Sequence, residues 1–454
     1  MVGLWHCQGM ARASDHRPQP ASPPAAAATP SPARQGSIRD ANLALLYRLI
    51  VDAPAPLSRA ALAATTGMTR ATASALADAL LAARLVEEVS PPPATGAGRP
   101  AAGLVPAASG PVGLGLEINV DYLAACVVDL TGTVRHSLTL HGDQRGRRPE
   151  EILADLAGLA RKVSDAPLTI AGTAVAVPGL VEGPHGRIRR APNLVWQDVE
   201  IEQGLRELLP HTPFDPVVGN EADFAALAEA QAAGRPRAGS DGRRPALGDA
   251  AAADGPEAAQ SAGRSRTGSE GQAVLAGSNV SAPAARQGAP LTDFLYVSGE
   301  IGVGAGIVLG GELFRGARGW AGEIGHVTVE PDGVRCRGGA HGCLETVAGL
   351  EALMRSGPEA AAGALGRAVA TAVNLLDLPA VVLGGVYARP EFAGVLLPAV
   401  EATLAQHVVS AGWAPVAVHV SWLGETAAAQ GAAVAVVRRI HADPAGWVEV
   451  LTRS

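Results

Sequence analysis

The segment "PVGLGLEINVDYLAACVVDLTGTV", residues 111–134, sets the fold class that we expect for this chain. Its short apolar runs have the character of strands, and the turn chemistry of "DLTGT" indicates a hairpin. The segment "DFLYVSGEIGVGAGIVLGGELFRG", residues 293–316, has the same strand-and-glycine character. Two similar halves predict an α/β domain with two lobes and a cleft between them.

Two segments have a composition that does not support a packed core. Residues 1–36 are rich in Ala, Pro, Ser and Arg, and we expect a disordered N-terminal arm there. Residues 233–290 have the same character but interrupt two periodic segments, so we interpret them as a low-complexity, disordered insertion. Such an insertion is tolerated because loop-closure entropy grows only logarithmically with length.

Composition and charge limit the class of protein. The chain has 454 residues and 48% hydrophobic content, which is enough for two or three packed domains. A formal net charge of -7 argues against a wholly basic nucleic-acid coat. Any contact with DNA must therefore be local.

Cysteine usage and hydropathy indicate the compartment. The chain has four cysteines, which are Cys7, Cys126, Cys336 and Cys343. They are too few for a disulfide scaffold, which fits a reducing compartment. No apolar run reaches the roughly 20 residues that a membrane span requires, and the N-terminus lacks the apolar centre of a secretory signal. We expect a cytoplasmic protein with no membrane partner, associated with the nucleoid when it is bound to DNA.

Residues 37–107 predict a winged helix-turn-helix domain. Leucines at helical spacing predict a first helix, which "APAP" ends because proline cannot continue it. Ser58 caps a short second helix and Thr69 caps a third, and the glycine of the intervening "TTGMT" suits a positive φ. The following stretch, "LVEEVSPPPATGAGRPAAGLVP", predicts a two-stranded wing with Arg99 at its tip.

The polar start of the third helix is the candidate surface for the major groove of DNA, and Arg99 is the candidate for the minor groove. The candidate DNA-binding residues are Arg59, Thr69, Arg70, Thr72, Ser74 and Arg99. Residues 37–106 hold six arginines and five acidic residues, so we expect few phosphate contacts per protomer and binding as a dimer. The alternative interpretation is a helical packing or oligomerisation module.

Amides and carboxylates from several loops form a second set of candidates. They are Asn193, Asn220, Glu221, Glu323, His326 and Glu345. A polyhydroxylated ligand needs such groups because each sugar hydroxyl both donates and accepts hydrogen bonds. Each residue alone is more often a cap or a surface turn, so only the whole set indicates a sugar site.

The motifs "PGLVEGPHGRIRRAPNLVW", "NEADFAALAEA", "GAGIVLGGELFRGARGWAGEIGH" and "CRGGAHGCLE" together resemble those of the ROK family (repressors, open reading frames, kinases). The resemblance runs from about Ser37 to the C-terminus, apart from the insertion. It implies a two-lobed, actin-like domain of the ribonuclease H-like, sugar-kinase type, formed by residues 108–232 and 291–454. It also implies that the six candidates above contact a sugar.

The motifs that a kinase needs depart from the pattern of the family's kinases. "EINVD" at residues 117–121 stands where those kinases have Asp-x-Gly-Gly-Thr, and "EIGVG" at 300–304 stands for Gly-Thr-Gly-Ile-Gly. Lost glycines block close backbone approach to phosphates, and added carboxylates repel them. Glu221 occupies the base position, where the kinases have aspartate, and we interpret it as vestigial. We therefore expect no catalytic residues, no bound ATP and no enzymatic activity.

The resemblance and these departures lead to one functional hypothesis. We expect a sugar-responsive transcriptional regulator, a repressor of genes for carbohydrate uptake or catabolism. Its partners would be a double-stranded DNA operator, a small sugar or sugar-phosphate effector, and further copies of itself in a homodimer or homotetramer. The alternative hypotheses are a ROK sugar kinase with an appended DNA-binding module, and a DNA-binding protein controlled by a protein partner.

The segment "GHVTVEPDGVRCRGGAHGC", residues 325–343, resembles the zinc loop of the family, which uses His and then Cys-x-Cys-Gly-x-x-Gly-Cys. On that pattern His326, Cys336 and Cys343 are ligands of a structural zinc, and Gly338 replaces the middle cysteine. His341 is a candidate fourth ligand. Two alternatives stay open, a metal-free loop with two buried thiols and a catalytic zinc with an open water position.

Overall fold

The computed structural model describes residues 35–90, 102–164, 168–183, 186–209, 212–233 and 291–453. The expected arm up to residue 34, the insertion from 234 to 290, and Arg99 at the wing tip lie outside the described residues. Among the described helices, none is long and apolar enough to cross a membrane.

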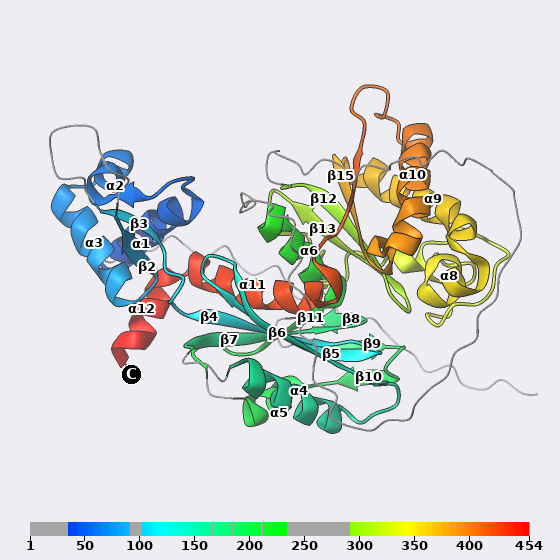
Figure 1. The fold of residues 1–454 in the computed structure, drawn as a ribbon, viewed down its shortest axis with the longest axis horizontal. Helices are drawn as coiled ribbons and strands as arrows, with labels where there is room; N and C mark the ends of the chain where they lie inside the picture. The colour runs from blue at the N-terminus through cyan, green and yellow to red at the C-terminus, as the bar shows by residue number, and fades with distance from the viewer. Residues whose placement is uncertain are drawn as a thin grey trace, which may run out of the picture.

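An N-terminal domain lies at one end of the molecule and contains a small antiparallel sheet with strand order β1-β3-β2 (Figure 1). Its elements are α1 (Gln35–Asp52), β1 (Leu57–Ser58), α2 (Arg59–Thr66), α3 (Arg70–Ala82), β2 (Val86–Val89) and β3 (Gly103–Pro106). The first helix begins two residues before the expected domain boundary. The predicted pair of wing strands also gains a third strand, because Leu57 and Ser58 pair with β3.

Local hydrogen bonds explain where α2 and α3 begin. The Ser58 hydroxyl accepts a hydrogen bond from the backbone N–H of Ala61 at 3.2 Å. The Thr69 hydroxyl accepts one from the backbone N–H of Thr72 at 3.1 Å. Gly67 ends α2 with a φ of 71°, a conformation that glycine adopts without a steric cost. The predicted caps and turn are therefore confirmed.

The first lobe is built on a five-stranded sheet with strand order β11-β7-β4-β5-β6, and a small sheet with order β10-β9-β8 lies beside it. Its elements are β4 (Val112–Ile118), β5 (Tyr122–Asp129), β6 (Val134–His141), α4 (Pro149–Val163), β7 (Ile170–Val177), β8 (Leu180–Glu182), β9 (Arg187–Ala191), β10 (Trp196–Val199), α5 (Glu202–Leu208), β11 (Val217–Asn220) and α6 (Glu221–Ala233). The turn predicted at "DLTGT" joins β5 to β6, where the Asp129 carboxylate accepts hydrogen bonds from the backbone N–H groups of Thr131 and Thr133.

The second lobe repeats the arrangement of the first, with strand order β14-β13-β12-β15-β16. Its elements are β12 (Phe294–Gly299), β13 (Val303–Leu309), β14 (Glu312–Leu313), η1 (Ile324–His326), α7 (Glu345–Ala348), α8 (Leu350–Ser356), α9 (Pro358–Leu376), β15 (Ala380–Gly385), η2 (Val386–Ala388), α10 (Pro390–His407) and β16 (Ala417–Val420). In both lobes an antiparallel hairpin is extended on one side by two parallel strands. The prediction of two similar halves is confirmed.

The C-terminal helices leave the second lobe and return to the first. After η3 (Gly424–Thr426), α11 (Ala427–Ala442) lies across β4 and α6, and α12 (Pro444–Arg453) follows it. Glycines allow this close approach, because a Cβ at Gly115 would lie 1.9 Å from the Ala429 carbonyl oxygen and one at Gly431 would lie 1.6 Å from that of Phe224. The helix α11 is thus held directly against the backbone of the first lobe.

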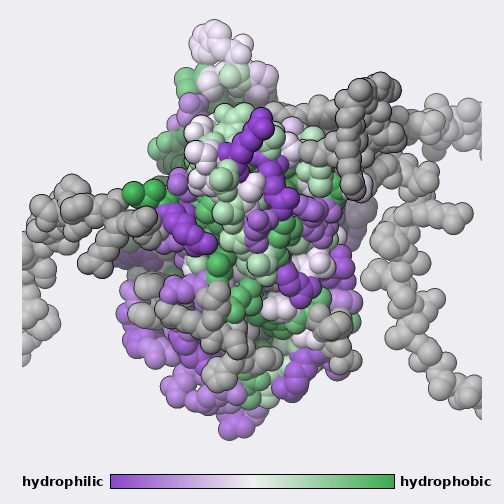
Figure 2. Space-filling model, turned by 90° about the vertical axis from the view of Figure 1, so that its left-hand side faces the viewer, coloured by the Kyte–Doolittle hydropathy of each residue, from purple (hydrophilic) through white to green (hydrophobic). Residues whose placement is uncertain are grey.

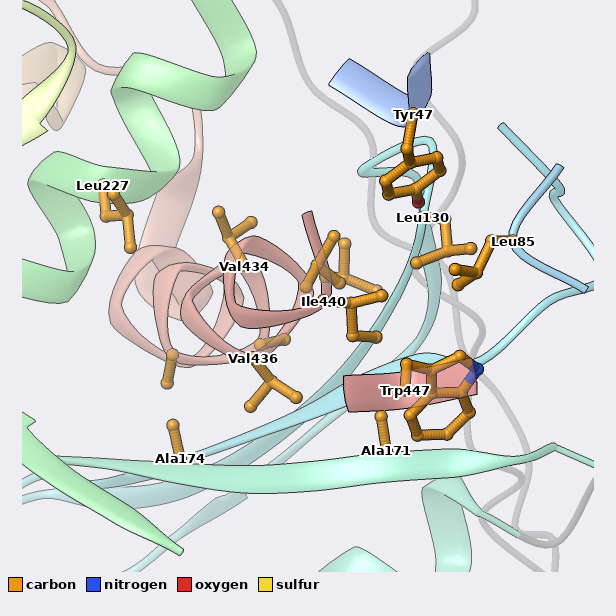
Figure 3. Packing of buried hydrophobic residues seen from close by; sticks show 14 of the residues in the cluster. Tyr47, Leu85, Leu130, Ala171, Ala174, Leu227, Val434, Val436, Ile440 and Trp447 are labelled. Carbon is orange, nitrogen blue, oxygen red and sulfur yellow. The ribbon is translucent and has the colours of Figure 1, made fainter. Parts of the chain in front are cut away.

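One continuous hydrophobic core joins the N-terminal domain to the first lobe. Figure 3 shows Tyr47 of α1, Leu85 and Trp447 of α12 gathered beside Ile440 at the end of α11. The Trp447 side chain is 1% exposed, and its indole N–H donates a hydrogen bond to the Ala83 carbonyl oxygen at 3.3 Å. The N-terminal domain therefore packs on the same helices that pack on the central sheet.

Candidate functional site

The six residues predicted to contact a sugar line one cleft between the lobes. Asn193 lies between β9 and β10, Asn220 and Glu221 lie where β11 meets α6, Glu323 and His326 lie at η1, and Glu345 begins α7. The space in the cleft, including its open mouth, is about 710 Å³. That is in the range of pockets that hold small organic ligands.

Asn220 lines the cleft and also has a structural role. Its side-chain oxygen accepts hydrogen bonds from the backbone N–H groups of Ala222 at 2.8 Å and Asp223 at 3.3 Å, which caps α6. Its side-chain nitrogen donates to the Gly179 carbonyl oxygen at 3.0 Å. These bonds fix the start of α6 and thereby the position of Glu221.

His326 lies between two carboxylates of the cleft. Its Nε2 is 3.9 Å from Glu323 Oε2, and its Nδ1 is 3.8 Å from Glu345 Oε1. Burial raises the pKa of Glu323, the neighbouring His326 lowers it, and the charge of Glu345 raises it again. Carboxylates and an imidazole in this arrangement can accept and donate hydrogen bonds to vicinal hydroxyls.

Arg337 is a cleft residue that the sequence reasoning missed. Its guanidinium donates a hydrogen bond to the Asn193 side-chain oxygen and another to Glu351 at 3.1 Å. Arg190 in turn donates to the Arg337 carbonyl oxygen at 2.8 Å. The only signal in the sequence was the position of Arg337 beside Cys336, which does not by itself indicate a ligand contact.

A narrow recess of four glutamates adjoins the cleft. Glu117, Glu221, Glu300 and Glu425 line it, together with Asn119 and Tyr122. Burial raises the pKa of Glu117 to about 7. Burial and then the charge of Glu117 raise the pKa of Glu300 to about 8. Two departures from the kinase motifs, at Glu117 and Glu300, therefore meet in one place.

The recess predicts a specific dependence of stability on pH. Because Glu300 has a folded pKa of about 8 against an ordinary value of 4.5, the folded protein holds a proton that the unfolded chain has lost between those values. Stability therefore falls as pH rises through that window. We expect the Glu300→Gln variant to match the wild type at about pH 5 and to have a higher Tm than the wild type near pH 8.

Thermal unfolding followed by circular dichroism across the window measures this difference. Glu150→Gln, at an exposed position on α4 outside the recess, is the matched control for loss of one carboxylate. If the dependence of Tm on pH for Glu300→Gln runs parallel to that of the wild type, Glu300 is ionised in the folded protein across the whole pH window.

His326, Cys336 and Cys343 form a candidate metal-binding group, in which one ligand atom of each lies within 4.8 Å of the others. The Cys336 and Cys343 sulfurs are 3.2 Å apart, and His326 Nδ1 is 3.7 Å from the Cys336 sulfur. Ligands of a tetrahedral Zn²⁺ are separated by roughly 3.3–3.8 Å, given Zn–S and Zn–N bonds of about 2.3 and 2.0 Å. The three residues therefore fit the metal that the zinc loop implies.

The proposed fourth ligand does not join this group. The His341 side chain is exposed, and its ring nitrogens are not among the ligand atoms that lie within 4.8 Å of one another. A Cβ built at Gly338 would instead lie 3.1 Å from His326 Nδ1 and 3.3 Å from the Cys336 sulfur. The open corner of the group is thus at the position of the missing cysteine.

The candidate DNA-binding residues have different surroundings. Arg70 and Thr72 are exposed at the start of α3, Ser74 is half-buried, and Thr69 is engaged as the helix cap. Arg59 forms ion pairs with Asp78 at 2.7 Å and Glu88 at 2.8 Å, so these carboxylates compete with any phosphate. Figure 2, which views the molecule from the side of the N-terminal domain, shows hydrophilic and hydrophobic surface interspersed.

Known proteins of similar sequence and structure support the two-lobed fold. The xylose repressor of Bacillus spizizenii is 25% identical over 328 residues, which cover 71% of this chain and 70% of the repressor. A crystal structure of a ROK family transcriptional regulator, a homologue of the Escherichia coli MLC protein, superimposes with a TM-score of 0.64 at 22% identity and covers 91% of this chain and 99% of its own. A ROK family glucokinase from Streptomyces griseus, solved with glucose and AMPPNP, covers 71% of this chain and 98% of its own with a TM-score of 0.53 at 20% identity.

The family pattern itself matches the two halves of the two-lobed domain. The ROK family pattern matches residues 113–238 and 278–364, which include the first hairpin, the β11–α6 junction and the metal-binding group. The structural neighbours have the sugar-kinase type of actin-like fold that the sequence predicted. The two-lobed domain of this chain therefore carries the ROK family pattern on the fold of a ROK family transcriptional regulator.

Proposed function

We propose that the protein is a sugar-responsive transcriptional regulator, a repressor of genes for carbohydrate uptake or catabolism. The observation that carries the proposal is the core that joins the N-terminal domain to α11 and α12. The similarity to xylose repressors supports it. On this proposal residues 37–107 bind DNA and the remaining described chain binds the effector.

The order of α1, α2 and α3 and the small β1-β3-β2 sheet support a winged helix-turn-helix in the N-terminal domain. We infer that α3 enters the major groove with Arg70 and Thr72 at its exposed start, while β2 and β3 form the wing. Because residues 37–106 hold six arginines against five acidic residues, we expect few phosphate contacts per copy and specific binding by two copies on a palindromic site. We therefore expect a homodimer or homotetramer.

The helix α11 provides the physical link between cleft and DNA-binding domain. At its N-terminal end Ala427 and Ala428 line the glutamate recess, and the backbone N–H of Ala429 donates to Glu117 at 3.2 Å. At its C-terminal end His441 packs edge-on against Tyr47 of α1, with ring centroids 5.5 Å apart. A sugar that closes the lobes would shift α11 and so change the population of DNA-competent dimers.

The similarity to ROK glucokinases favours a second candidate function, a sugar kinase with an appended DNA-binding module. The recess argues against it, because Glu300 puts a carboxylate where a kinase of this family has the first glycine of its second phosphate loop. Sugar-dependent release of ADP from ATP by the purified protein would establish the kinase. We expect none above background.

Selection of sheared genomic fragments by the purified protein, with and without a panel of sugars, tests the regulator. We expect a few palindromic sites beside genes for sugar transport or catabolism, and a change in their recovery with one sugar. The Arg70→Ala variant should lose these sites, while Arg355→Ala, at an exposed position on α8, should retain them. Recovery of no specific site by the wild type would make the N-terminal domain a packing module.

We also propose that His326, Cys336 and Cys343 hold a structural zinc that fixes the loop presenting Glu345 to the cleft. Gly338→Cys then restores a fourth ligand, and we expect zinc affinity to rise by roughly tenfold or more. The backbone tolerates the change, although the His326 ring must shift because a Cβ at 338 lies 2.8 Å from its Cε1. Competition with a chromophoric chelator measures the affinity.

Gly363→Cys, on α9, is the matched control for this variant and should leave zinc affinity unchanged. If Gly338→Cys binds zinc no more tightly than the wild type, the group does not have the open coordination corner that we assign to it.

A further inference from the structure

A second open space adjoins the sugar cleft at Asn220, which lines both spaces. Its volume, including the open mouth, is about 950 Å³, which is within the range of pockets that hold small organic ligands. We call it the side pocket, and its lining consists of residues 181–183, 218–220, Asp223 and 315–319. Apart from Asn220, none of these residues was a candidate in the sequence.

The same three segments of the chain form walls of the cleft and of the side pocket. One segment runs along residues 178–183, and a second runs along residues 218–223, where β11 meets α6. The third belongs to the second lobe and runs along residues 315–326, from the side pocket to Glu323 and His326 in the cleft. The two spaces are therefore adjacent, and a ligand of two linked sugar units has one space for each.

Asp223 lies in the wall of the side pocket as a buried carboxyl group with an unused oxygen. The residue is 4% exposed, and its Oδ1 has no hydrogen-bond partner among the described residues. Its Oδ2 is 3.9 Å from Arg315 Nε, which is too far for a hydrogen bond. Burial raises the pKa of Asp223 to about 7, while the charge of Arg315 lowers it. A buried carboxyl group without a partner is costly, so a ligand that forms a hydrogen bond with it stabilises the site.

Two arginines of the second lobe line the side pocket, whereas Asp223 belongs to the first lobe. Arg315 and Arg318 are exposed, and within the described part of the chain neither guanidinium donates a hydrogen bond. The Arg318 guanidinium lies 5.7 Å from the centroid of the Trp320 ring, a cation–π contact that favours this position. The side pocket thus offers a buried carboxyl group from one lobe and free donors from the other.

This mixture of groups favours a neutral hydroxylated ligand over an ion. An anion would be attracted by the two arginines but repelled by the carboxylates of Asp223 and Glu182, and a cation would meet the opposite conflict. A sugar hydroxyl donates to a carboxylate and accepts from a guanidinium. It also forms a hydrogen bond with Asp223 whether or not that carboxyl group carries a proton.

We propose that the effector of this protein is an oligosaccharide, with one sugar unit in the cleft and the next unit in the side pocket, where its hydroxyls contact Asp223 and Arg318. This inference rests on the proposed effector role of the cleft. Because the second unit contacts both lobes, it draws them together. Residues 315–319 lead directly to Glu323, so a ligand in the side pocket also positions a residue of the cleft.

Isothermal titration calorimetry with the full-length protein tests the proposal. The probes are α- and β-linked disaccharides of glucose, galactose, mannose and xylose, each compared with the monosaccharides that it contains. We expect one disaccharide to bind roughly tenfold to a hundredfold more tightly than either of its monosaccharides, because it gains hydrogen bonds to charged groups. Inorganic phosphate, which two arginines alone would favour, should not compete with it.

Two variants assign the gain to the side pocket. Asp223→Ala and Arg318→Ala should each weaken binding of the disaccharide by about tenfold and leave binding of the monosaccharide as in the wild type. Arg318 is exposed, so its replacement tests the pocket even if Asp223→Ala does not fold. Arg367→Ala, at an exposed position on α9, is the matched control and should bind both ligands as the wild type does.

The outcomes separate this proposal from the proposed function. The oligosaccharide proposal is overturned if no disaccharide binds more tightly than its monosaccharides, if phosphate displaces the disaccharide, or if either folded variant keeps wild-type affinity for it. A monosaccharide that changes operator affinity without any preference for a disaccharide leaves the regulator standing. A disaccharide that binds as expected and leaves operator affinity unchanged supports the ligand class and contradicts the regulatory function.

Discussion

Replacement of Trp447 by alanine should uncouple the N-terminal domain from the effector domain and lower the free energy of unfolding by about 3–5 kcal/mol. The indole is 1% exposed, packs beside Phe214 with ring centroids 5.9 Å apart, and bonds to the Ala83 carbonyl oxygen. Its loss leaves a cavity where α12 meets both domains, and the surrounding groups come from three separate parts of the chain. We expect operator binding to survive in part and its response to effector to disappear.

Urea unfolding followed by circular dichroism measures the stability, and fluorescence anisotropy of labelled operator DNA measures the response. Trp413→Ala is the matched control, because that indole is 87% exposed and its removal should change stability by less than about 0.5 kcal/mol. A Trp447→Ala protein that keeps a full effector response would rule out the α11–α12 path as the link between cleft and DNA.

Short-range patterns predicted most of the fold. Ser58, Thr69 and Gly67 have roles that depend on a few neighbouring residues, and the Asp129 turn is decided within five residues, so all of them could be inferred from the sequence. The return of α11 to the first lobe could not. It depends on close backbone contacts between residues such as Gly115 and Ala429, which lie far apart in the chain.

The candidate site also has parts that the sequence predicted and parts that it did not. The cleft residues carry family motifs, and all six of them line one space. Arg337 and the recess were not foreseen, because their roles follow from side chains meeting across the lobes. The sequence identified Glu117 and Glu300 as separate departures from phosphate-binding loops, but it gave no reason to place them in one recess. His341 was inferred to be a fourth metal ligand because it is close to Cys343 in the sequence. Its side chain is exposed and does not join the other ligands, so closeness in the sequence was not enough.

Gly431→Ala should be among the most damaging single-methyl additions in this protein. A Cβ at Gly431 would lie 1.6 Å from the Phe224 carbonyl oxygen of α6, so α6 and α11 must separate to admit it. Overpacking of this kind costs typically 1–3 kcal/mol, and contact with backbone rather than a flexible side chain puts the expected loss at about 3 kcal/mol or more. Because α11 also carries Ala429 beside Glu117, the shift should weaken effector binding at the same time.

Gly158→Ala on α4 is the matched control for that methyl group. Beyond the neighbouring backbone of its own helix, no atom lies within 4 Å of a Cβ at Gly158, so the change should instead stabilise the protein by about 0.5–1 kcal/mol through helix propensity and a restricted unfolded chain. Both variants replace a helical glycine by alanine, so both gain the same helix propensity. If their changes in the free energy of unfolding have opposite signs, the loss in Gly431→Ala comes from the close contact between α11 and α6. Equal stability of Gly431→Ala and the wild type would mean that α11 moves freely on α6, and a helix that moves freely cannot transmit closure of the cleft to Tyr47 and the N-terminal domain.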